Sequence, residues 1–83
     1  MDLSAFEIKD RTSFVEFIKL LHEDFLNNPE NWGNKTLGDF LEAMTRYTED
    51  IQGYYDNTKQ NVIADTPSWQ VFADILKGST MYG

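Results

Sequence analysis

The side chains that could do acid–base chemistry are carboxylates within one predicted helix in the middle of the chain. Asp39 and Glu42 stand three residues apart, and Glu49 and Asp50 follow two turns later. Helical spacing brings such groups close together, and paired carboxylates can serve as general acid and general base. Arg46 lies between the two pairs, however, and all five side chains fall on the polar side of the helix. We therefore expect a solvated charged face and no catalytic residue.

The only histidine, His22, has no neighbours that would make it a base or a metal ligand. One helical turn away it meets Ile18, Lys19, Phe25 and Leu26. None of these side chains binds a metal ion. We expect a histidine at the boundary of the core without a catalytic role.

A loop that begins at Asp56 has oxygen-bearing side chains at alternating positions, as calcium loops do. Its tight-turn position holds Asn61 in place of glycine, and its bidentate glutamate position holds Pro67. The chain also has no cysteine, its five glycines are scattered, and no serine pairs with the histidine in a recognisable arrangement. We therefore expect no metal site and no cofactor.

Aromatic side chains make up 14% of the chain, so many of them must be inside a core of this size. The largest group that could also meet a partner consists of Trp32, Tyr47, Tyr54, Tyr55 and Trp69. Tyrosine and tryptophan are enriched both in small cores and at protein interfaces. Helical spacing places the tyrosines on an apolar side, which favours the core, with Tyr47 and Tyr54 partly exposed at its edge. The sequence leaves open whether the cluster is core or interface.

Three amphipathic helices are predicted to position these residues, and the clearest covers residues 36–54. Thr36 suits its N-cap, and Asp39 suits the positive end of the helix dipole. Gly53 weakens the last turn. The apolar residues lie within an arc of about 160° on a helical wheel; they are Leu37, Phe40, Leu41, Ala43, Met44, Tyr47, Ile51, Tyr54 and Tyr55.

A first helix is predicted over residues 13–27, where Ser13 and Glu16 have the spacing of a capping box. Its apolar residues spread over about 240°, which is wider than one buried side requires. This predicts contacts on two sides, so we expect the first helix in the middle of the core. Asn28 and Pro29 end it, because the residue before proline avoids the α region.

A third helix is predicted over residues 66–77, with Thr66 as N-cap and Pro67 in the first helical position. Gly78 supplies the expected stop. The last five residues are expected to fray unless Met81 or Tyr82 packs back onto the domain.

The remaining segments are predicted to be loops and an arm that each attach to the core by few apolar residues. Phe6 and Ile8 are expected to dock a short N-terminal arm. Trp32 is expected to anchor the connector between the first two helices to the core. Val62 and Ile63 are expected to anchor the connector before the third helix. Together these elements predict an all-α fold, a compact three-helix domain with a short N-terminal arm.

Length and charge limit the classes of protein to consider. A chain of 83 residues suits a single domain, residues 1–83. The net charge of −7 disfavours nucleic acid and anionic membrane surfaces as partners. No apolar run approaches the ~18 residues of a membrane span, and the first residues do not have the pattern of a signal peptide. We expect a cytoplasmic protein.

Four motifs carry a resemblance to a family of small uncharacterised bacterial domains. They are NPExW, FLEAM, DxxGYY and PSWxxFA, within FVEFIKLLHEDFLNNPENWGNKTLGDFLEAMTRYTEDIQGYY and the later TPSWQVFADILKG. The resemblance runs from Phe14 to Gly78, and Gly33 and Gly38 depart from its pattern. It implies no known activity. The small, acidic, single-domain form is similar to that of bacterial immunity and inhibitor proteins.

The function that we expect is protein–protein contact, with no enzymatic activity. The acidic side of the middle helix and its neighbouring aromatic residues would bind a protein partner. A basic protein is one such partner. The candidate partner-binding residues are Trp32, Asp39, Glu42, Tyr47, Glu49, Asp50, Tyr54 and Tyr55. A structural homo-oligomer and a small enzyme that uses the carboxylates are the alternatives, and the sequence does not decide between monomer and homodimer.

Overall fold

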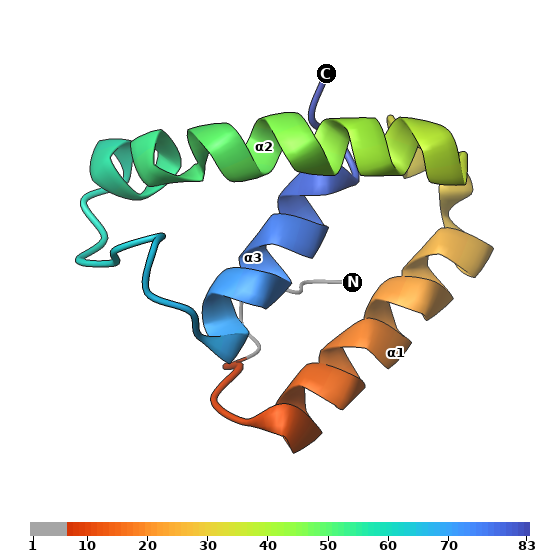
Figure 1. The fold of residues 1–83 in the computed structure, drawn as a ribbon. Helices are drawn as coiled ribbons and strands as arrows, with labels where there is room; N and C mark the ends of the chain where they lie inside the picture. The colour runs from red at the N-terminus through yellow and green to blue at the C-terminus, as the bar shows by residue number, and fades with distance from the viewer. Residues whose placement is uncertain (1–6) are drawn as a thin grey trace.

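The computed structural model describes residues 7–83, which form three α-helices and one short 3-10 helix (Figure 1). These elements are α1 (Arg11–Asn27), η2 (Pro29–Asn31), α2 (Leu37–Asn57) and α3 (Trp69–Ser79). Residues 7–83 contain no strand, so the predicted all-α three-helix fold is confirmed. Ile8 of the N-terminal arm is buried as expected, whereas Phe6 lies outside the described residues.

Helix α1 begins one turn earlier than the capping-box spacing predicts. Asp10 is the N-cap, and its carboxylate accepts a hydrogen bond of 2.8 Å from the Ser13 backbone N–H. The Ser13 hydroxyl accepts in return from the Asp10 backbone N–H at 3.1 Å. Ser13 thus belongs to a capping box, but at its third helical position and not at the N-cap, because a second capping side chain precedes it.

Helix α2 begins where the sequence predicts and ends later. Thr36 is the N-cap, and its hydroxyl accepts from the Asp39 backbone N–H at 3.1 Å. The helix continues through Gly53 to Asn57, three residues beyond the predicted end. Ile51 precedes Gly53 and Tyr55 follows it, and both side chains are buried. Their tertiary contacts therefore outweigh the low helix propensity of that glycine.

Helix α3 begins and ends two residues later than predicted. Its N-cap is Ser68, whose hydroxyl accepts from the Val71 backbone N–H at 3.1 Å. The Thr66 backbone N–H instead donates to the Ile63 carbonyl at 3.0 Å, so Thr66 belongs to the preceding turn. Gly78 is not the stop, because it lies inside the helix, which ends at Ser79.

Helix α3 lies between the other two helices and contacts both (Figure 1). This corrects the prediction that the first helix occupies the middle of the core. Most of the buried apolar residues form two clusters: Ile8, Phe17, Leu21 and Ala73 on the α1 side, and Ile51, Tyr55 and Val71 on the α2 side. Because α3 supplies Ala73 to one cluster and Val71 to the other, one short helix serves both sides.

The connectors attach to the core through few side chains. Trp32 packs against the α1 cluster, as expected. In the later connector Val62 packs against the α2 cluster together with Ala64. Ile63 is 65% exposed, so its predicted anchoring role is wrong. Gln52 of α2 holds this connector, since its amide donates to the Val62 carbonyl at 2.9 Å and accepts from the Ala64 N–H at 2.7 Å.

The C-terminal tail packs back onto the domain, and Tyr82 is the residue that anchors it. The Tyr82 ring meets the Tyr47 ring edge-on, with centroids 5.0 Å apart. The Thr80 carbonyl accepts from the backbone N–H groups of Gly33 and Asn34 at 2.9 and 3.0 Å. These bonds join the tail to the segment that leads into α2.

Candidate interaction surface

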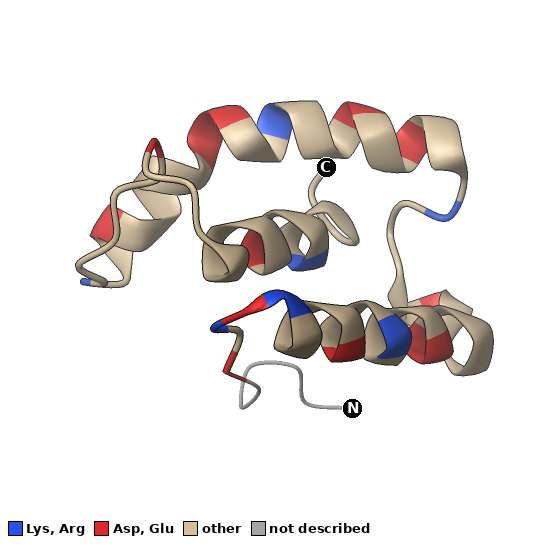
Figure 2. Ribbon diagram, turned by 60° about the horizontal axis from the view of Figure 1, so that its bottom comes forward, with Lys and Arg blue, Asp and Glu red and all other residues tan. Residues whose placement is uncertain are grey.

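The four predicted acidic residues all lie exposed along α2. They are Asp39, Glu42, Glu49 and Asp50. Figure 2 shows the acidic positions of α2 on the side of the helix away from α1. Glu42 pairs with Arg46 at 3.4 Å, and both side chains stay about half or more exposed. These carboxylates therefore form a solvated charged side, which we call the acidic side of α2.

The predicted aromatic residues divide between surface and core. Tyr54 is 44% exposed and Tyr47 is half-buried, as their position at the edge of the apolar arc predicts. Tyr55 is fully buried, and its hydroxyl donates to Asp74 at 2.7 Å. Tyr55 is therefore a core residue and cannot touch a partner. The sequence left open whether these tyrosines belong to the core or to an interface. The structure places Tyr55 in the core and leaves Tyr47 and Tyr54 partly exposed.

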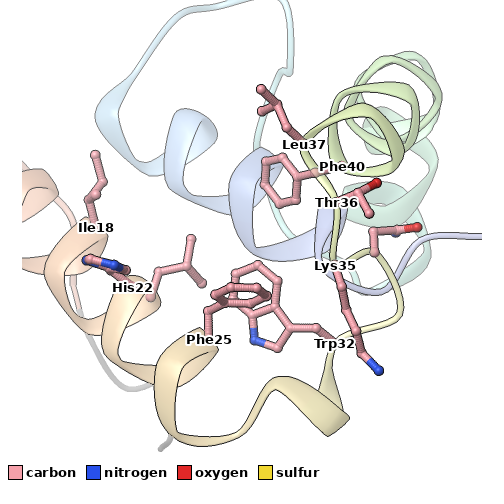
Figure 3. Close-up of a pocket in the computed structure, with 10 residues that line it drawn as sticks. Ile18, His22, Phe25, Trp32, Lys35, Thr36, Leu37 and Phe40 are labelled. Atoms are coloured by element: carbon pink, nitrogen blue, oxygen red, sulfur yellow. The ribbon is translucent and has the colours of Figure 1, made fainter.

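Trp32 is half-buried and sits at one end of an apolar groove between α1 and α2 (Figure 3). The groove is open to solvent and has a volume of about 270 Å³. Its lining residues come from α1, the connector and the first turns of α2; they are Ile18, Leu21, His22, Phe25, Trp32, Asn34, Lys35, Thr36, Leu37 and Phe40.

A row of three aromatic rings forms the connection between α1 and α2 at this groove. Phe25 of α1 meets Trp32 edge-on with centroids 5.0 Å apart. Trp32 in turn stacks against Phe40 of α2, with centroids 6.1 Å apart. The indole N–H of Trp32 donates to Asp24 at 2.9 Å, which fixes the ring in place. The two helices are therefore joined at this end by side chains while their backbones stay apart.

The sides of the groove carry large apolar side chains in contact with solvent. Leu37 is 74% exposed and Ile18 is 43% exposed. In Figure 3 they project from α2 and α1 on the two sides of the opening. The sequence analysis placed both among the apolar residues of their helices. The signal that could have identified the groove is the 240° apolar arc of the first helix, because one neighbouring helix cannot cover so wide an arc.

His22 and the side chains of metal-binding type are the groups left to place outside the acidic side of α2. His22 is exposed and lies at the edge of the groove. Within residues 7–83, no three side chains of the metal-binding types come together. In the same range, every helix is too short or too polar to cross a lipid bilayer.

A second pocket, which we call the tyrosine pocket, lies between α2 and α3. Its volume is about 270 Å³, and its lining residues are Tyr47, Tyr54, Asp74, Lys77, Gly78 and Met81. The Tyr47 ring lies so close to Gly78 that a Cβ there would fall 2.2 Å from ring atoms. Asp74 accepts hydrogen bonds from the Tyr55 hydroxyl and from the Gln70 amide, the latter at 2.9 Å.

The surroundings of the tyrosine pocket raise the pKa values of Tyr47 and Tyr55 above the ordinary value of a phenol. Burial raises the pKa of Tyr47, and the nearby Tyr54 and Asp74 raise it further. Burial also raises the pKa of Tyr55 strongly, and the hydrogen bond that Tyr55 donates to Asp74 adds to that effect. Among the residues that line this pocket, Asp74 supplies a carboxylate.

Comparison with known families matches most of the chain to a family whose function is not known. Residues 10–83 match the profile of a family described as "Family of unknown function (DUF7660)". The match extends beyond both ends of the predicted resemblance, which began at Phe14 and ended at Gly78. No curated protein and no solved structure matches the chain.

Proposed function

We propose a function for this chain, which belongs to the DUF7660 family of unknown function, from the surface that its fold leaves open. It is a protein–protein interaction module, and the apolar groove between α1 and α2 is its working surface. The observation that carries this proposal is the exposure of Leu37 and Ile18 on the two sides of an almost wholly apolar groove.

The shape and chemistry of the groove suit an amphipathic helix of another protein. Contiguous apolar surface is uncommon on soluble monomers and marks places where partners bind. A groove between two helices can accept the apolar side of a third, which is a recurrent mode of peptide recognition. The aromatic row of Phe25, Trp32 and Phe40 would form the floor, and aromatic residues contribute much of the binding energy in such interfaces.

Charge indicates that the partner is basic and is not a second copy of this chain. The net charge is −7, and the exposed carboxylates of Asp39 and Glu42 belong to the same helix as Leu37 and Phe40. The acidic side of α2 lies away from α1 and so outside the groove (Figure 2). Its charge would attract a basic partner during approach, while the apolar side of the partner enters the groove. Two copies of this chain would instead bring like charges together, which opposes association.

The finer aspects of the expected function form part of the same proposal. They are a bacterial setting, a location in the cytoplasm, an immunity- or inhibitor-like role and the absence of enzymatic activity. The acidic side of α2 supports an inhibitor-like role, because it would attract a basic target. Trp32 remains a candidate contact within the groove, and Tyr54 remains one outside it, whereas Tyr55 is fully buried and does not.

The test is affinity capture from an extract of the native host with three forms of the protein as bait. They are the wild type, Leu37→Asp in the groove, and Ile63→Asp as a matched control. Both positions are exposed apolar residues, but Ile63 follows the far end of α2. A protein retained by the wild type and by Ile63→Asp should be lost with Leu37→Asp, because a carboxylate in the groove is costly to desolvate.

A fourth bait distinguishes binding at the groove from binding at the acidic side of α2. The double variant Glu42→Lys/Asp50→Lys should weaken capture and reduce its dependence on salt, since it removes charge attraction without changing the groove. Equal capture by Leu37→Asp and the wild type rules out the groove as the working surface. Loss of capture with the double variant alone would place the partner on the acidic side instead.

A further inference from the structure

The tyrosine pocket between α2 and α3 brings two aromatic rings and one carboxylate together. The rings of Tyr47 and Tyr54 have centroids 6.5 Å apart and are inclined at 48° to each other. Both line the pocket, as does Asp74 of α3. This site is separate from the apolar groove, with which it shares no lining residue.

The carboxylate of Asp74 is fixed in place by neutral donors. Its Oδ2 accepts from the Tyr55 hydroxyl at 2.7 Å, and its Oδ1 accepts from the Gln70 amide at 2.9 Å. Neither donor neutralises its charge. The ion pairs among residues 7–83 are Lys19–Glu16 and Arg46–Glu42, and neither involves Asp74. The pocket therefore holds an oriented negative charge without a cationic partner in the described part of the chain.

We propose that the tyrosine pocket binds a quaternary ammonium group, held by the rings of Tyr47 and Tyr54 and by the charge of Asp74. A cation is attracted to an aromatic face when it lies within about 6 Å of the ring centroid. With centroids 6.5 Å apart and ring planes inclined at 48°, a cation cannot fit directly between the rings, but one seated beside both, off the line that joins the centroids, lies within that range of each. The volume of about 270 Å³ accommodates a trimethylammonium head.

The hydrogen bonds of Asp74 favour a quaternary ammonium over a guanidinium or a primary ammonium. The latter two cations carry N–H donors that need acceptors once they leave water. Each oxygen of Asp74 already accepts one hydrogen bond, which leaves fewer free acceptor sites on the carboxylate than a primary ammonium or a guanidinium has donors, and aromatic rings are poor acceptors. A quaternary ammonium has no N–H group, so it needs charge attraction and ring contact alone.

Lys77 also lines the pocket, and its role separates this proposal from an anion site. Its side chain is exposed, and long lysine side chains place their ammonium in water while the stem covers apolar surface. For a cation in the pocket, this ammonium is a repulsive neighbour. Replacing it with a neutral side chain should therefore strengthen binding of a cation and would weaken binding of an anion.

The experiment is an NMR titration of the protein with tetramethylammonium chloride, with sodium chloride and guanidinium chloride at equal ionic strength as controls. Saturable shifts at Tyr47, Tyr54, Gly78 and Met81 are expected with tetramethylammonium. Smaller shifts are expected with the two other salts. Shifts that do not saturate, or that sodium chloride reproduces, would overturn the proposal.

A matched pair at Tyr54 tests the contribution of the ring itself. Tyr54→Phe keeps an aromatic ring and should bind tetramethylammonium about as well as the wild type, whereas Tyr54→Leu should bind about two- to fivefold more weakly. Tyr54 is 44% exposed, so both variants should fold. Unchanged affinity in Tyr54→Leu, or weaker binding in Lys77→Gln, contradicts the proposal.

Two further ligands distinguish the possible sources of the cation. Choline represents a free solute, and a short peptide with one trimethyllysine represents a side chain of a partner protein. Tighter binding of choline assigns the pocket to a small molecule, and tighter binding of the peptide assigns it to a modified protein. The Leu37→Asp variant should bind either ligand as the wild type does, so failure of the groove proposal and failure of this one are distinguishable.

Discussion

At the scale of single residues, the contact between Tyr47 and Gly78 shapes the join of α2 and α3. The phenol ring occupies the space in which any other residue at position 78 would place its Cβ. The same ring meets Tyr82 of the tail and lines the tyrosine pocket. One glycine therefore permits the close approach of α3, the position of the tail and the shape of a candidate binding site.

Replacement of two helical glycines by alanine should have opposite effects on stability. Gly53→Ala, where a Cβ would have nothing within 4 Å, should stabilise the fold by about 0.5–1 kcal/mol through helix propensity. Gly78→Ala should destabilise it by about 1–3 kcal/mol, because its Cβ would overlap the Tyr47 ring. Urea denaturation of the two variants measures the sign of each change in the free energy of unfolding. A stabilised Gly78→Ala would show that the ring is free to move away.

The Tyr55 hydroxyl should contribute to stability, whereas the Tyr54 hydroxyl should not. Tyr55→Phe removes a buried donor to the carboxylate of Asp74, and hydrogen bonds to charged groups contribute about 1.5–3 kcal/mol. Tyr54→Phe, at a residue 44% exposed, is the control and should change the unfolding free energy by less than about 0.5 kcal/mol. Thermal denaturation of the pair measures this difference.

The raised pKa of Tyr55 predicts a loss of stability at alkaline pH. An unfolded chain releases the phenol proton near the ordinary tyrosine pKa of 10.0, whereas the folded chain keeps it to higher pH. Its contribution is therefore fully present below pH 10.0 and falls as the pH rises further. Urea midpoints measured across this range should fall less steeply for Tyr55→Phe than for the wild type. If the urea midpoints of the two proteins fall equally with rising pH, the loss of stability does not come from the Tyr55 phenol.

At the scale of the elements, side-chain caps set the beginnings of α1, α2 and α3. Asp10, Thr36 and Ser68 each accept a hydrogen bond from a backbone N–H within the first turn. All three belong to the residue types that favour N-caps. The local sequence pattern correctly predicted Thr36 as the N-cap of α2. It failed at the two other helices, because each has two capping side chains close together in sequence.

Replacement of the two candidate caps of α3 should confirm which one begins the helix. Ser68→Ala removes the acceptor for the Val71 backbone N–H and should cost about 0.5–2 kcal/mol of stability. Thr66→Ala, at an exposed residue in the preceding turn, should change stability by less than about 0.5 kcal/mol. Chemical denaturation of the two variants measures both effects. A larger loss with Thr66→Ala would place the cap at the position that the sequence predicted.

At the scale of the whole molecule, the position of α3 between α1 and α2 decides which apolar residues are buried. Leu21 and Leu37 both belong to predicted apolar arcs. Leu21 faces α3 and is 7% exposed, whereas Leu37 borders the groove and is 74% exposed. The groove exists because α3 fills the space between the two outer helices on one side only.

This difference in burial should appear directly as a difference in stability. Leu21→Ala should destabilise the fold by about 2–5 kcal/mol, as large-to-small changes in a core do. Leu37→Ala should change it by less than about 0.5 kcal/mol. Circular dichroism during urea denaturation measures both. A large loss with Leu37→Ala would show that the groove is closed in solution and would remove the surface on which the proposed function rests.

The sequence by itself determined the helices, their approximate ends, the acidic side of α2 and the partly exposed Tyr47 and Tyr54. These features follow from hydrophobic spacing and capping side chains that act within a few residues. Only the tertiary structure decided that α3 is central, that Tyr55 is buried on Asp74, and that Ile18 and Leu37 border an open groove. Helical spacing shows which residues share a side of a helix. What covers that side depends on contacts between segments far apart in the sequence.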